Sequence, residues 1–364
     1  MKHLFTALLL MTASACASGE QDHPFVAEEV AQFDKPWAMA FLPDGRLLVT
    51  EKPGRLFAVT QDGTKTPISG LPDVAYGGQG GLGDVALHPQ FDDNGLLYLS
   101  YAEAGDDGLH GAALARAQLE LTADGGTLSG LQVIWRQVPK VTGRGHYGHR
   151  LLFSADGYLF VSSGERQKFD PSQDMQSNLG KILRLNDDGS VPPDNPFADQ
   201  GGVTAEIWSL GHRNPLGVAF DPDGQLWNTE MGPRGGDELN RVLRGENYGY
   251  PIVSNGRHYS GRNIPDHDTR PEFAAPAAWW TPVISPGGLM IYSGDLFADW
   301  QGDALIPGLS SQALVRVDLD GSEAREAERF EMDRRIRAAV EGPAGAIWLL
   351  EDGSGGRLLK LTPR

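Results

Sequence analysis

A short phrase, in which a polar turn leads into an apolar strand, returns along the whole chain. The turn carries Asp-Gly, Asn-Gly or a close variant, and the two dipeptides supply the positive φ angles that a tight hairpin needs. The copies lie at 43–51, 93–99, 155–161, 222–227 and 343–348, with a looser copy at 300–306. Each of the six copies predicts one sheet built from hairpins, and such a repeat is typical of a β-propeller with about six blades.

The strands around these turns fit the same fold. Continuously apolar strands such as 38–41 and 217–220 precede the turns, as expected where both faces are covered. Most turns are followed by strands of alternating polarity, which we expect to expose one face: 55–59, 113–117, 181–185, 313–317 and 357–361. A β-sandwich would also give short strands, but it would not explain the returning phrase. We therefore predict an all-β fold, a single six-bladed β-propeller domain over residues 24–364.

Two further predictions concern the closure of the ring and its loops. Residues 26–31 form a strand-like segment that should close the ring beside the C-terminal strands and protect the exposed edges. The insertions at 164–180 and 250–283 are too irregular for blades and should lie as loops over one face. No long helix is expected, because Gly, Pro and β-branched residues interrupt every candidate window.

The charge and the first residues bear on partners and location. A formal net charge of −17 argues against nucleic acid and against an anionic membrane surface, because both would repel the chain. Residues 1–15 combine a basic start, an apolar run and small residues, as a signal peptide does, and residues 16–23 read as a short linker. The chain's single cysteine, Cys16, follows the signal peptide, so either a lipid anchor on Cys16 or ordinary secretion is expected. Both place the protein in the periplasm or outside the cell, and one cysteine excludes an internal disulfide.

Three polar segments stand out against the strands. The glycine-punctuated turn 143–150 holds His146 and His149 directly before an apolar strand, where binding and catalytic residues concentrate. Arg213 and Asn214 lie in a second turn and need partners if they are buried, so they either line a site or support a loop. In the segment 335–337 the two arginines share one face of an extended chain while Ile336 points away, an arrangement that suits a ligand with carboxylates or a pairing with surface acids.

Two loops carry weaker signals. The segment 230–240 is rich in oxygen ligands and in Gly and Pro, a mixture that suits a hard cation such as calcium, although a solvated acidic loop is the plain alternative. The glycine-rich loop 76–83 lacks the Lys-Ser/Thr pair and the helix of a phosphate-binding loop, so a nucleotide site is not predicted there.

Taken in order, these segments resemble the aldose sugar dehydrogenases that depend on pyrroloquinoline quinone (PQQ), relatives of the soluble quinoprotein glucose dehydrogenase. The resemblance spans nearly all of residues 33–363. It rests on the ordered segments 78–83, the turn at His146, 178–186, 211–215, 230–233 with 237–240, 246–251 and 335–337.

The resemblance implies a six-bladed propeller and a role for each matching residue. His146 is similar to the general base, and Arg213 would stabilise charge on the quinone. The implied cofactor contacts are Gln79, Arg213, Asn214, Tyr259, Ser310, Ser311, Gln312, Arg335, Ile336 and Arg337. Gly232 and Pro233 match carbonyls that hold the cofactor's Ca²⁺, and Glu238 and Tyr248 look like ligands of a second, structural calcium. His149 has no matching role and is interpreted as structural.

The implied activity is oxidation of the C1 hydroxyl of an aldose to a lactone, with hydride transfer to PQQ and a quinone or cytochrome as the final electron acceptor. The chain departs from the glucose enzyme at Ser310, which stands in place of a lysine, and at Gly145, which stands in place of an acid. The alternatives are a calcium-dependent propeller lactonase or hydrolase and a binding propeller without catalysis. The lactonase would have no use for Arg335 and Arg337.

Overall fold

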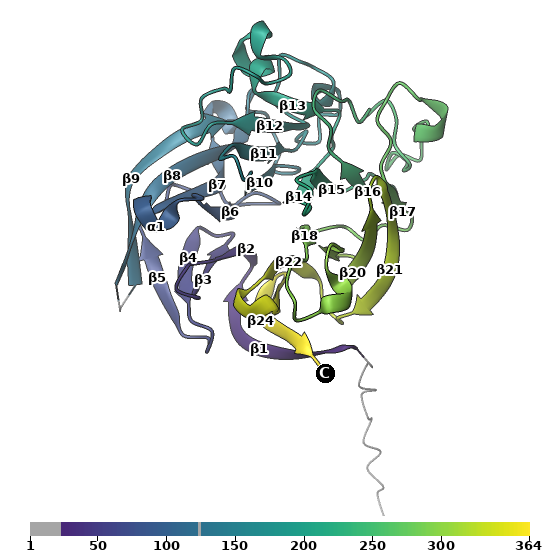
Figure 1. Cartoon of the computed structure of the whole chain (residues 1–364). Coiled ribbons are helices and arrows are strands. Elements are labelled where there is room, and N and C mark those ends of the chain that lie inside the picture. The colour runs from purple at the N-terminus through teal and green to yellow at the C-terminus, as the bar shows by residue number, and fades with distance from the viewer. Residues whose placement is uncertain (1–22, 123–124) are drawn as a thin grey trace, which may run out of the picture.

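Residues 23–122 and 125–364 are described by a computed structural model, so the predicted signal peptide and Cys16 lie outside the described residues. The chain forms a ring of small sheets around a central axis (Figure 1). The elements are β1 (Phe25–Asp34), β2 (Pro36–Phe41), β3 (Leu47–Glu51), β4 (Arg55–Val59), β5 (Lys65–Ser69), β6 (Leu82–Leu87), α1 (Phe91–Asn94), β7 (Leu96–Ala104), β8 (His110–Thr122), β9 (Gly125–Arg136), β10 (Gly148–Phe153), β11 (Leu159–Ser163), β12 (Lys181–Leu185), β13 (Ile207–Leu210), β14 (Pro215–Phe220), β15 (Leu226–Glu230), β16 (Asp237–Arg241), β17 (Ala278–Trp280), β18 (Met290–Ile291), β19 (Ala304–Pro307), β20 (Ala313–Asp320), β21 (Glu323–Glu331), β22 (Ile336–Glu341), β23 (Ile347–Glu351) and β24 (Ser354–Pro363).

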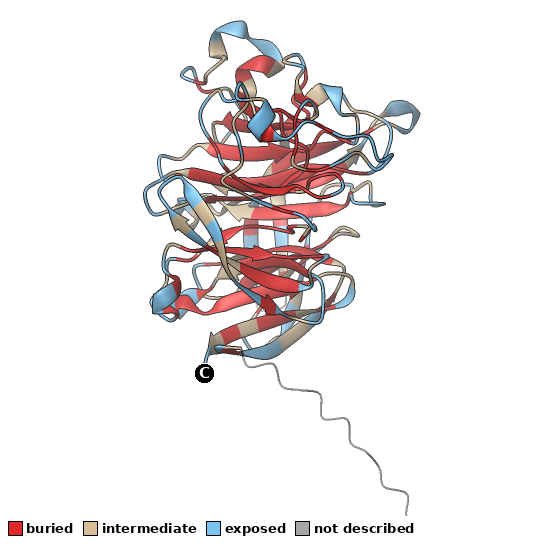
Figure 2. Ribbon diagram, turned by 90° about the vertical axis from the view of Figure 1, so that its right-hand side faces the viewer, coloured by how far each residue is buried: buried red, intermediate tan, exposed pale blue. Residues whose placement is uncertain are grey.

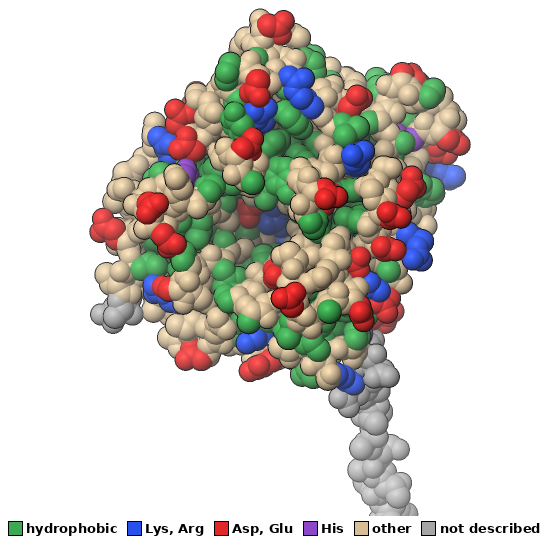
Figure 3. Space-filling model, in the orientation of Figure 1, with side chains coloured by type: hydrophobic (Ala, Val, Ile, Leu, Met, Phe, Trp, Pro, Cys, Tyr) green, Lys and Arg blue, Asp and Glu red, His purple; other side chains and the backbone are tan. Residues whose placement is uncertain are grey.

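The sheets repeat one pattern, which makes the fold a β-propeller. Four separate sheets have four strands each, in the orders β1-β24-β23-β22, β10-β11-β12-β13, β14-β15-β16-β17 and β18-β19-β20-β21. The remaining sheet has eight strands in the order β2-β3-β4-β5-β9-β8-β7-β6. In the described residues, strand pairing joins its two halves only at β5 and β9, which are parallel with Ile68 opposite Gly126 and Ser69 opposite Thr127. A space-filling view shows a hollow at the centre of the ring (Figure 3).

The ring is closed by its first described strand, as predicted from the sequence. β1 pairs antiparallel with β24, from Phe25 opposite Pro363 to Asp34 opposite Ser354. The closing sheet therefore contains both ends of the domain, and the edge strand β24 is covered.

The repeated turns adopt the predicted backbone conformation. Gly45, Gly157, Gly224 and Gly345 have φ values of 86°, 88°, 80° and 78°, a region in which side chains are strained. In each turn the glycine nitrogen donates to the carbonyl three residues earlier, for example Gly157 to Ser154 at 3.0 Å. The turn residues therefore fix where each first strand ends and the second begins.

Burial follows the strand position within each sheet (Figure 2). The second strands β3, β11, β15 and β23 are buried at every residue. The prediction that 181–185 exposes one face is wrong, because all five residues of β12 are buried. Its two cations have partners inside the protein: the Arg184 guanidinium lies 3.8 Å from the ring centre of Tyr158, and the Lys181 ammonium is surrounded by carbonyls.

Lys181 gives a prediction about stability. Its Nζ donates to the carbonyls of Pro171, Ser172 and Leu179 at 2.6, 3.1 and 2.8 Å, and burial lowers its pKa to about 7. Lys181→Met should lower the free energy of unfolding by about 2–3 kcal/mol, because buried carbonyls lose their donor. Above pH 7 the folded protein has lost the proton that the unfolded lysine still holds. The difference in the free energy of unfolding between wild type and Lys181→Met should therefore grow from pH 7 towards 10. Urea unfolding of both proteins across that range checks this, with Lys65→Met, at an exposed lysine of β5, as the control. Equal pH slopes in wild type and Lys181→Met would contradict it.

The two insertions depart from the predicted loops at one point. The segment 164–180 forms no strand, as expected, but 250–283 contains β17, the fourth strand of its sheet. β17 is only three residues long and lies among Pro and Gly residues, which hid it from the sequence pattern. Within the described part of the chain, no helix has the length and apolar character needed to span a bilayer.

Candidate functional site

A cavity of about 180 Å³ lies where the innermost strands of several sheets begin. Its wall includes four residues predicted from the sequence: Gln79, Asn214, Arg335 and Arg337. The other lining residues are Trp37, Lys52, Tyr147, Gly148, His149, Leu216, Met231 and Leu309. The ring therefore brings together segments that lie more than 250 residues apart in the chain, as a propeller does at its axis.

His146 lies in the turn before β10 and is held by a buried carboxylate. Its Nδ1 bonds to Oε1 of Glu165 at very short range, and its backbone nitrogen donates to Oε1 of Gln79 at 2.7 Å. The second oxygen of Glu165 accepts from the backbone nitrogens of Lys168 and Phe169. With Nδ1 donating to Glu165, Nε2 is the unprotonated nitrogen available to a substrate. His146 has a φ of 46°, a strained conformation of the kind that clusters at functional sites.

The electrostatics keep this pair as a neutral imidazole beside a carboxylate. Burial lowers the pKa of His146 from its ordinary value, and the charges of Arg213 and Arg166 lower it further, against the opposing effect of Glu165. Burial alone would raise the pKa of Glu165, but the bonds from His146 and Phe169 and the charge of Arg213 outweigh it and lower the pKa. His146 can therefore accept a proton at neutral pH.

Arg213 and Asn214 lie directly before β14 and reach the same turn. Asn214 Oδ1 accepts from the nitrogen of Gly148 at 3.2 Å. The Arg213 backbone nitrogen donates to Glu230, and its side chain donates to the carbonyl of Met231 at 2.8 Å. Its Nε is buried without a partner among the described residues, which leaves a donor for a ligand. The predicted residue Tyr259 lies with its ring centre 6.0 Å from this guanidinium and is 72% exposed, at the rim and outside the cavity wall.

A cationic wall faces these groups from the start of β22. Arg335 Nε donates to Oδ2 of Asp352 at 2.9 Å, and Arg337 donates to Oδ1 at 3.0 and 2.8 Å. The two arginines share one face, as predicted, and Asp352 lies between them. Ile336 does not reach the cavity with its side chain, which is fully buried in the apolar core beside β22. The sequence did not single out Asp352, whose position is given by the β22–β23 pairing.

The segment 310–312 lies behind the cavity wall. Leu309 lines the cavity, whereas none of the three predicted residues does. Ser310 Oγ bonds to Ser285 Oγ at 2.8 Å, and the backbone of Gln312 accepts from Met332 at 2.8 Å. Ser311 Oγ is buried and has no partner among the described residues. The structure thus places these residues next to the site and leaves their contact with a ligand a prediction.

Gly232 and Pro233 offer main-chain oxygens for a cation. The Gly232 nitrogen donates to Oδ1 of Asp237 at 2.9 Å, and no residue of the described chain donates to the carbonyl of Gly232 or Pro233. A Cβ on Gly232 would lie 2.2 Å from the carbonyl oxygen of Gly236, so only glycine fits there. Burial raises the pKa of Asp237 to about 6. Unpartnered carbonyls beside a buried carboxyl suit a hard cation such as calcium.

The second predicted calcium site is less complete. Glu238 is buried 3.2 Å from the amide of Asn240 and 3.5 Å from His267, and burial raises its pKa. The Tyr248 hydroxyl is engaged by the backbone of Arg241 and Leu243, so Tyr248 could offer a metal only its carbonyl. In the described residues, no three His, Cys, Asp or Glu side chains gather as a metal site would require. Any metal here would depend mainly on carbonyl oxygens.

His149, interpreted as structural from the sequence, forms part of the cavity floor. It is 2% exposed, its ring stacks on Trp37 at 4.8 Å, and its Nδ1 lies 2.9 Å from Oγ of Ser100. Burial lowers its pKa to about 3, so the imidazole is neutral. The next residue, Arg150, donates hydrogen bonds to Asp84 and to the carbonyls of Leu216 and Gly287, and so links segments from different sheets.

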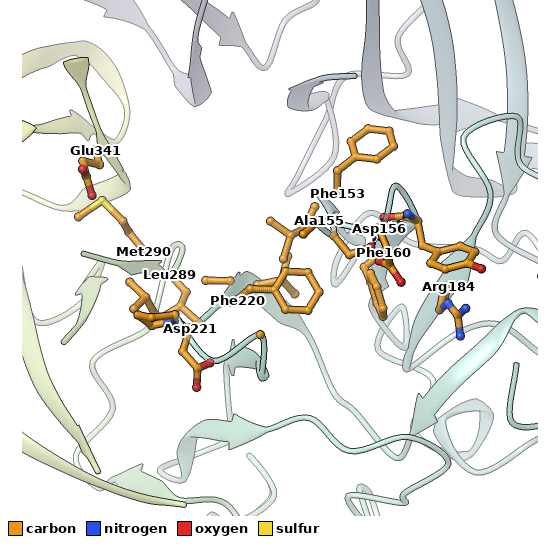
Figure 4. Close-up of a pocket in the computed structure, with 18 of the residues that line it drawn as sticks. Phe153, Ala155, Asp156, Phe160, Arg184, Phe220, Asp221, Leu289, Met290 and Glu341 are labelled. Carbon is orange, nitrogen blue, oxygen red and sulfur yellow. Dashed lines mark hydrogen bonds between the residues drawn. The ribbon is translucent and has the colours of Figure 1, made fainter. Parts of the chain in front are cut away.

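A larger cavity, of about 750 Å³, lies at the other end of the same inner strands (Figure 4). Apolar and aromatic residues such as Phe153, Phe160 and Phe220 dominate its wall. Its carboxylates already have donors: Asp221 accepts from Nε1 of Trp227 at 2.8 Å and Glu341 accepts from Ser293 at 2.8 Å. No histidine lines it, so the chemistry points to the smaller cavity with His146 at its edge.

Comparisons with known proteins identify the family of this chain. Residues 33–360 match the family model described as Glucose / Sorbosone dehydrogenase. The aldose sugar dehydrogenase YliI of Escherichia coli (strain K12) is 40% identical over 342 residues, 92% of this chain and 91% of the relative. The solved soluble aldose sugar dehydrogenase of Escherichia coli, in its apo form, superposes with a TM-score of 0.87 at 39% identity, covering 93% of this chain and 100% of that one. A PQQ-bound aldose sugar dehydrogenase from Streptomyces coelicolor gives 0.78 at 30% identity, covering 93% and 98%.

Proposed function

Because the chain belongs to the glucose/sorbosone dehydrogenase family, we propose that it oxidises the C1 hydroxyl of aldose sugars to lactones, with PQQ as hydride acceptor and Ca²⁺ as Lewis acid. The observation that carries this proposal is the position of a buried neutral histidine, His146, which is bonded to Gln79 of the wall and precedes Tyr147 of the wall, beside a cavity with an excess of cations. Lys52, Arg335 and Arg337 line that cavity, and Asp352 is the carboxylate that pairs with the two arginines. A net positive cavity in a chain of charge −17 suits a ligand with several carboxylates.

The residues present fit the two cofactors. Arg335, Arg337 and the unpartnered Nε of Arg213 would hold carboxylate or quinone oxygens, and the carbonyls of Gly232 and Pro233 would hold Ca²⁺. When bound, PQQ supplies the acceptor for the C1 hydrogen and its electron pair, and Ca²⁺ polarises the quinone oxygen.

The chain's own residues supply the proton chemistry. Nε2 of His146 accepts the proton of the C1 hydroxyl as the carbonyl of the lactone forms, a general-base step. Glu165 holds Nδ1, fixes the tautomer and stabilises the imidazolium that results. Gln79 orients the turn through the backbone of His146. Arg213, whose charge acts on His146, would stabilise negative charge that develops on the cofactor.

The function can be tested by reconstitution. The purified chain would be incubated with PQQ and Ca²⁺, and reduction of an artificial dye would be followed with glucose, galactose and maltose. We expect saturable turnover that requires PQQ and falls when calcium is chelated. Dye reduction without PQQ, or none with any aldose, would contradict the proposal.

The acid limb of the pH profile provides a second test. Because burial lowers the pKa of His146, kcat/KM should stay level from neutral pH to below 6.5 and fall only in more acidic buffer. Glu165→Gln removes the charge that opposes this lowering, so its acid limb should move to still lower pH while the plateau drops by about tenfold or more. A pH–rate series for both proteins measures the limbs; an acid limb that moves upward in Glu165→Gln would contradict the assignment.

Three finer points belong to the same proposal. We take the two halves of the eight-stranded sheet as separate blades, which with the four other sheets makes six. The leader predicted at residues 1–15 supports a periplasmic or secreted protein, with a lipid anchor if Cys16 is modified. A quinone or a cytochrome would then be the electron acceptor that returns the cofactor to its oxidised form.

A further inference from the structure

One cation of the cavity was not among the residues predicted to bind a ligand. Lys52 follows β3 in the turn before β4, and its side chain lines the cavity together with Arg335 and Arg337. Its Nζ makes one recorded bond, to the carbonyl oxygen of Gly78 at 3.0 Å. Among the described residues, no carboxylate lies within ion-pair distance of it, although Arg335 and Arg337 both bind Asp352.

The surroundings of Lys52 oppose its charge. Burial lowers its pKa most, and the nearby guanidinium of Arg337 lowers it further; Asp352 opposes this lowering less strongly than Arg337 causes it, and Lys35 adds a still smaller lowering. An ammonium that is half-buried beside an arginine without its own carboxylate costs stability. An anion bound in the cavity would offset this cost.

The backbone around Lys52 is built to hold it at this place. Its nitrogen donates to the carbonyl of Lys35 at 3.0 Å, and its carbonyl accepts from Leu82 at 2.9 Å. A Cβ on Gly81 would lie 2.4 Å from the Lys52 carbonyl oxygen, so the close approach requires glycine at that position. The glycine-rich loop 76–83, in which only Gln79 was given a role from the sequence, therefore positions Lys52 on one side and the turn of His146 on the other.

From this placement we propose that Lys52 is a ligand-binding residue of the cavity, whose ammonium contacts a carboxylate of the bound cofactor as part of the cationic lining that it forms with Arg335 and Arg337. The inference rests on the proposed function, because it takes PQQ as the anion. It assigns a binding role to a residue that was not among those predicted from the sequence.

The test is a titration of the cofactor-free protein with PQQ in calcium buffer, by calorimetry or by quenching of tryptophan fluorescence. Lys52→Met should weaken PQQ binding by about tenfold or more, the loss expected for a charge-assisted hydrogen bond. It should also make binding less sensitive to sodium chloride, and Lys52→Arg should restore most of the affinity. Lys35→Met is the matched control: Lys35 is the neighbouring lysine in space, its ammonium lies over the ring of Tyr76, and it is not part of the cavity wall.

Thermal unfolding without cofactor separates binding from folding. Lys52→Met should melt at or above the wild-type temperature, because the repulsion by Arg337 is relieved. Unchanged PQQ affinity in Lys52→Met would overturn the inference and leave the proposed function standing. A lower melting temperature without rescue by Lys52→Arg would show a structural role and also overturn it. If the wild-type protein binds no PQQ, the proposed function fails, and the inference fails with it.

Discussion

His146→Gln should reduce kcat for aldose oxidation by about 10²- to 10⁴-fold, the range expected when a general base is lost. Glutamine is of similar size but cannot take up a proton, so the hydroxyl proton would have no acceptor in the site. The loss should appear in kcat with the affinity for PQQ nearly unchanged, because His146 is absent from the cavity wall formed by the cationic residues. Steady-state dye reduction combined with PQQ titration separates the two quantities.

A second histidine variant controls for general damage. His88 lies beside α1, where its Nδ1 bonds to Asn94 at 2.9 Å, away from the cavity. His88→Gln should keep wild-type turnover. Full activity in His146→Gln would remove His146 as the base and leave the mechanism without a proton acceptor.

Arg337→Met should weaken PQQ binding by about a hundredfold or more. The Arg337 side chain is largely buried and donates twice to Asp352, so its removal takes away a guanidinium and leaves that carboxylate with Arg335 alone. Breaking one partner of a buried charge pair costs about 2–5 kcal/mol, and the leftover carboxylate would also repel an anionic ligand. PQQ titration of the cofactor-free variant measures the loss.

Arg334→Met is the comparison for this variant. Arg334 is three residues upstream, has a half-exposed side chain and lies 3.6 Å from Glu351, outside the cavity wall. Arg334→Met and Arg337→Met change the net charge by the same amount. Equal losses of PQQ affinity in both variants would therefore mean that the overall charge of the protein, and not the contact with Arg337, determines binding. Retained PQQ affinity in Arg337→Met would instead favour a hydrolase, which has no need of that arginine.

The fold was largely predictable because its information is local. The Asp-Gly dipeptides that end at Gly157 and Gly224 are visible in the sequence and predict tight turns, and both glycines have positive φ in the structure. The closing strand β1 was also predictable, because a strand-like segment at the start of the domain can cover the edge left by the C-terminal strands. The prediction of solvent exposure was wrong for β12, whose residues alternate in polarity as those of a surface strand do. Lys181 is buried because carbonyls of the insertion 164–180 accept its hydrogen bonds, and these contacts exist only in the folded chain.

The site was predictable where a residue type and its neighbours carry the signal. Arg335 and Arg337 share a face through their spacing, and the structure joins both to one carboxylate. The sequence analysis missed Glu165, Asp352 and Lys52, because their proposed roles depend on contacts with residues of other segments that only the folded chain brings together. A carboxylate two residues after a buried strand, as Glu165 is after β11, was the available signal for the partner of His146.

The Gly-Arg-Gly-His turn marks the centre of the proposed chemistry, and a single-turnover experiment tests it most directly. Protein loaded with PQQ and Ca²⁺ would be mixed without oxygen with an excess of glucose while the quinone absorbance is recorded and the sugar product is quantified. We predict loss of the oxidised quinone spectrum with one lactone formed for each cofactor reduced, and a far slower reaction in His146→Gln. An unchanged spectrum with no lactone formed, for glucose and for every other aldose tried, would contradict the assignment of this chain as a sugar dehydrogenase.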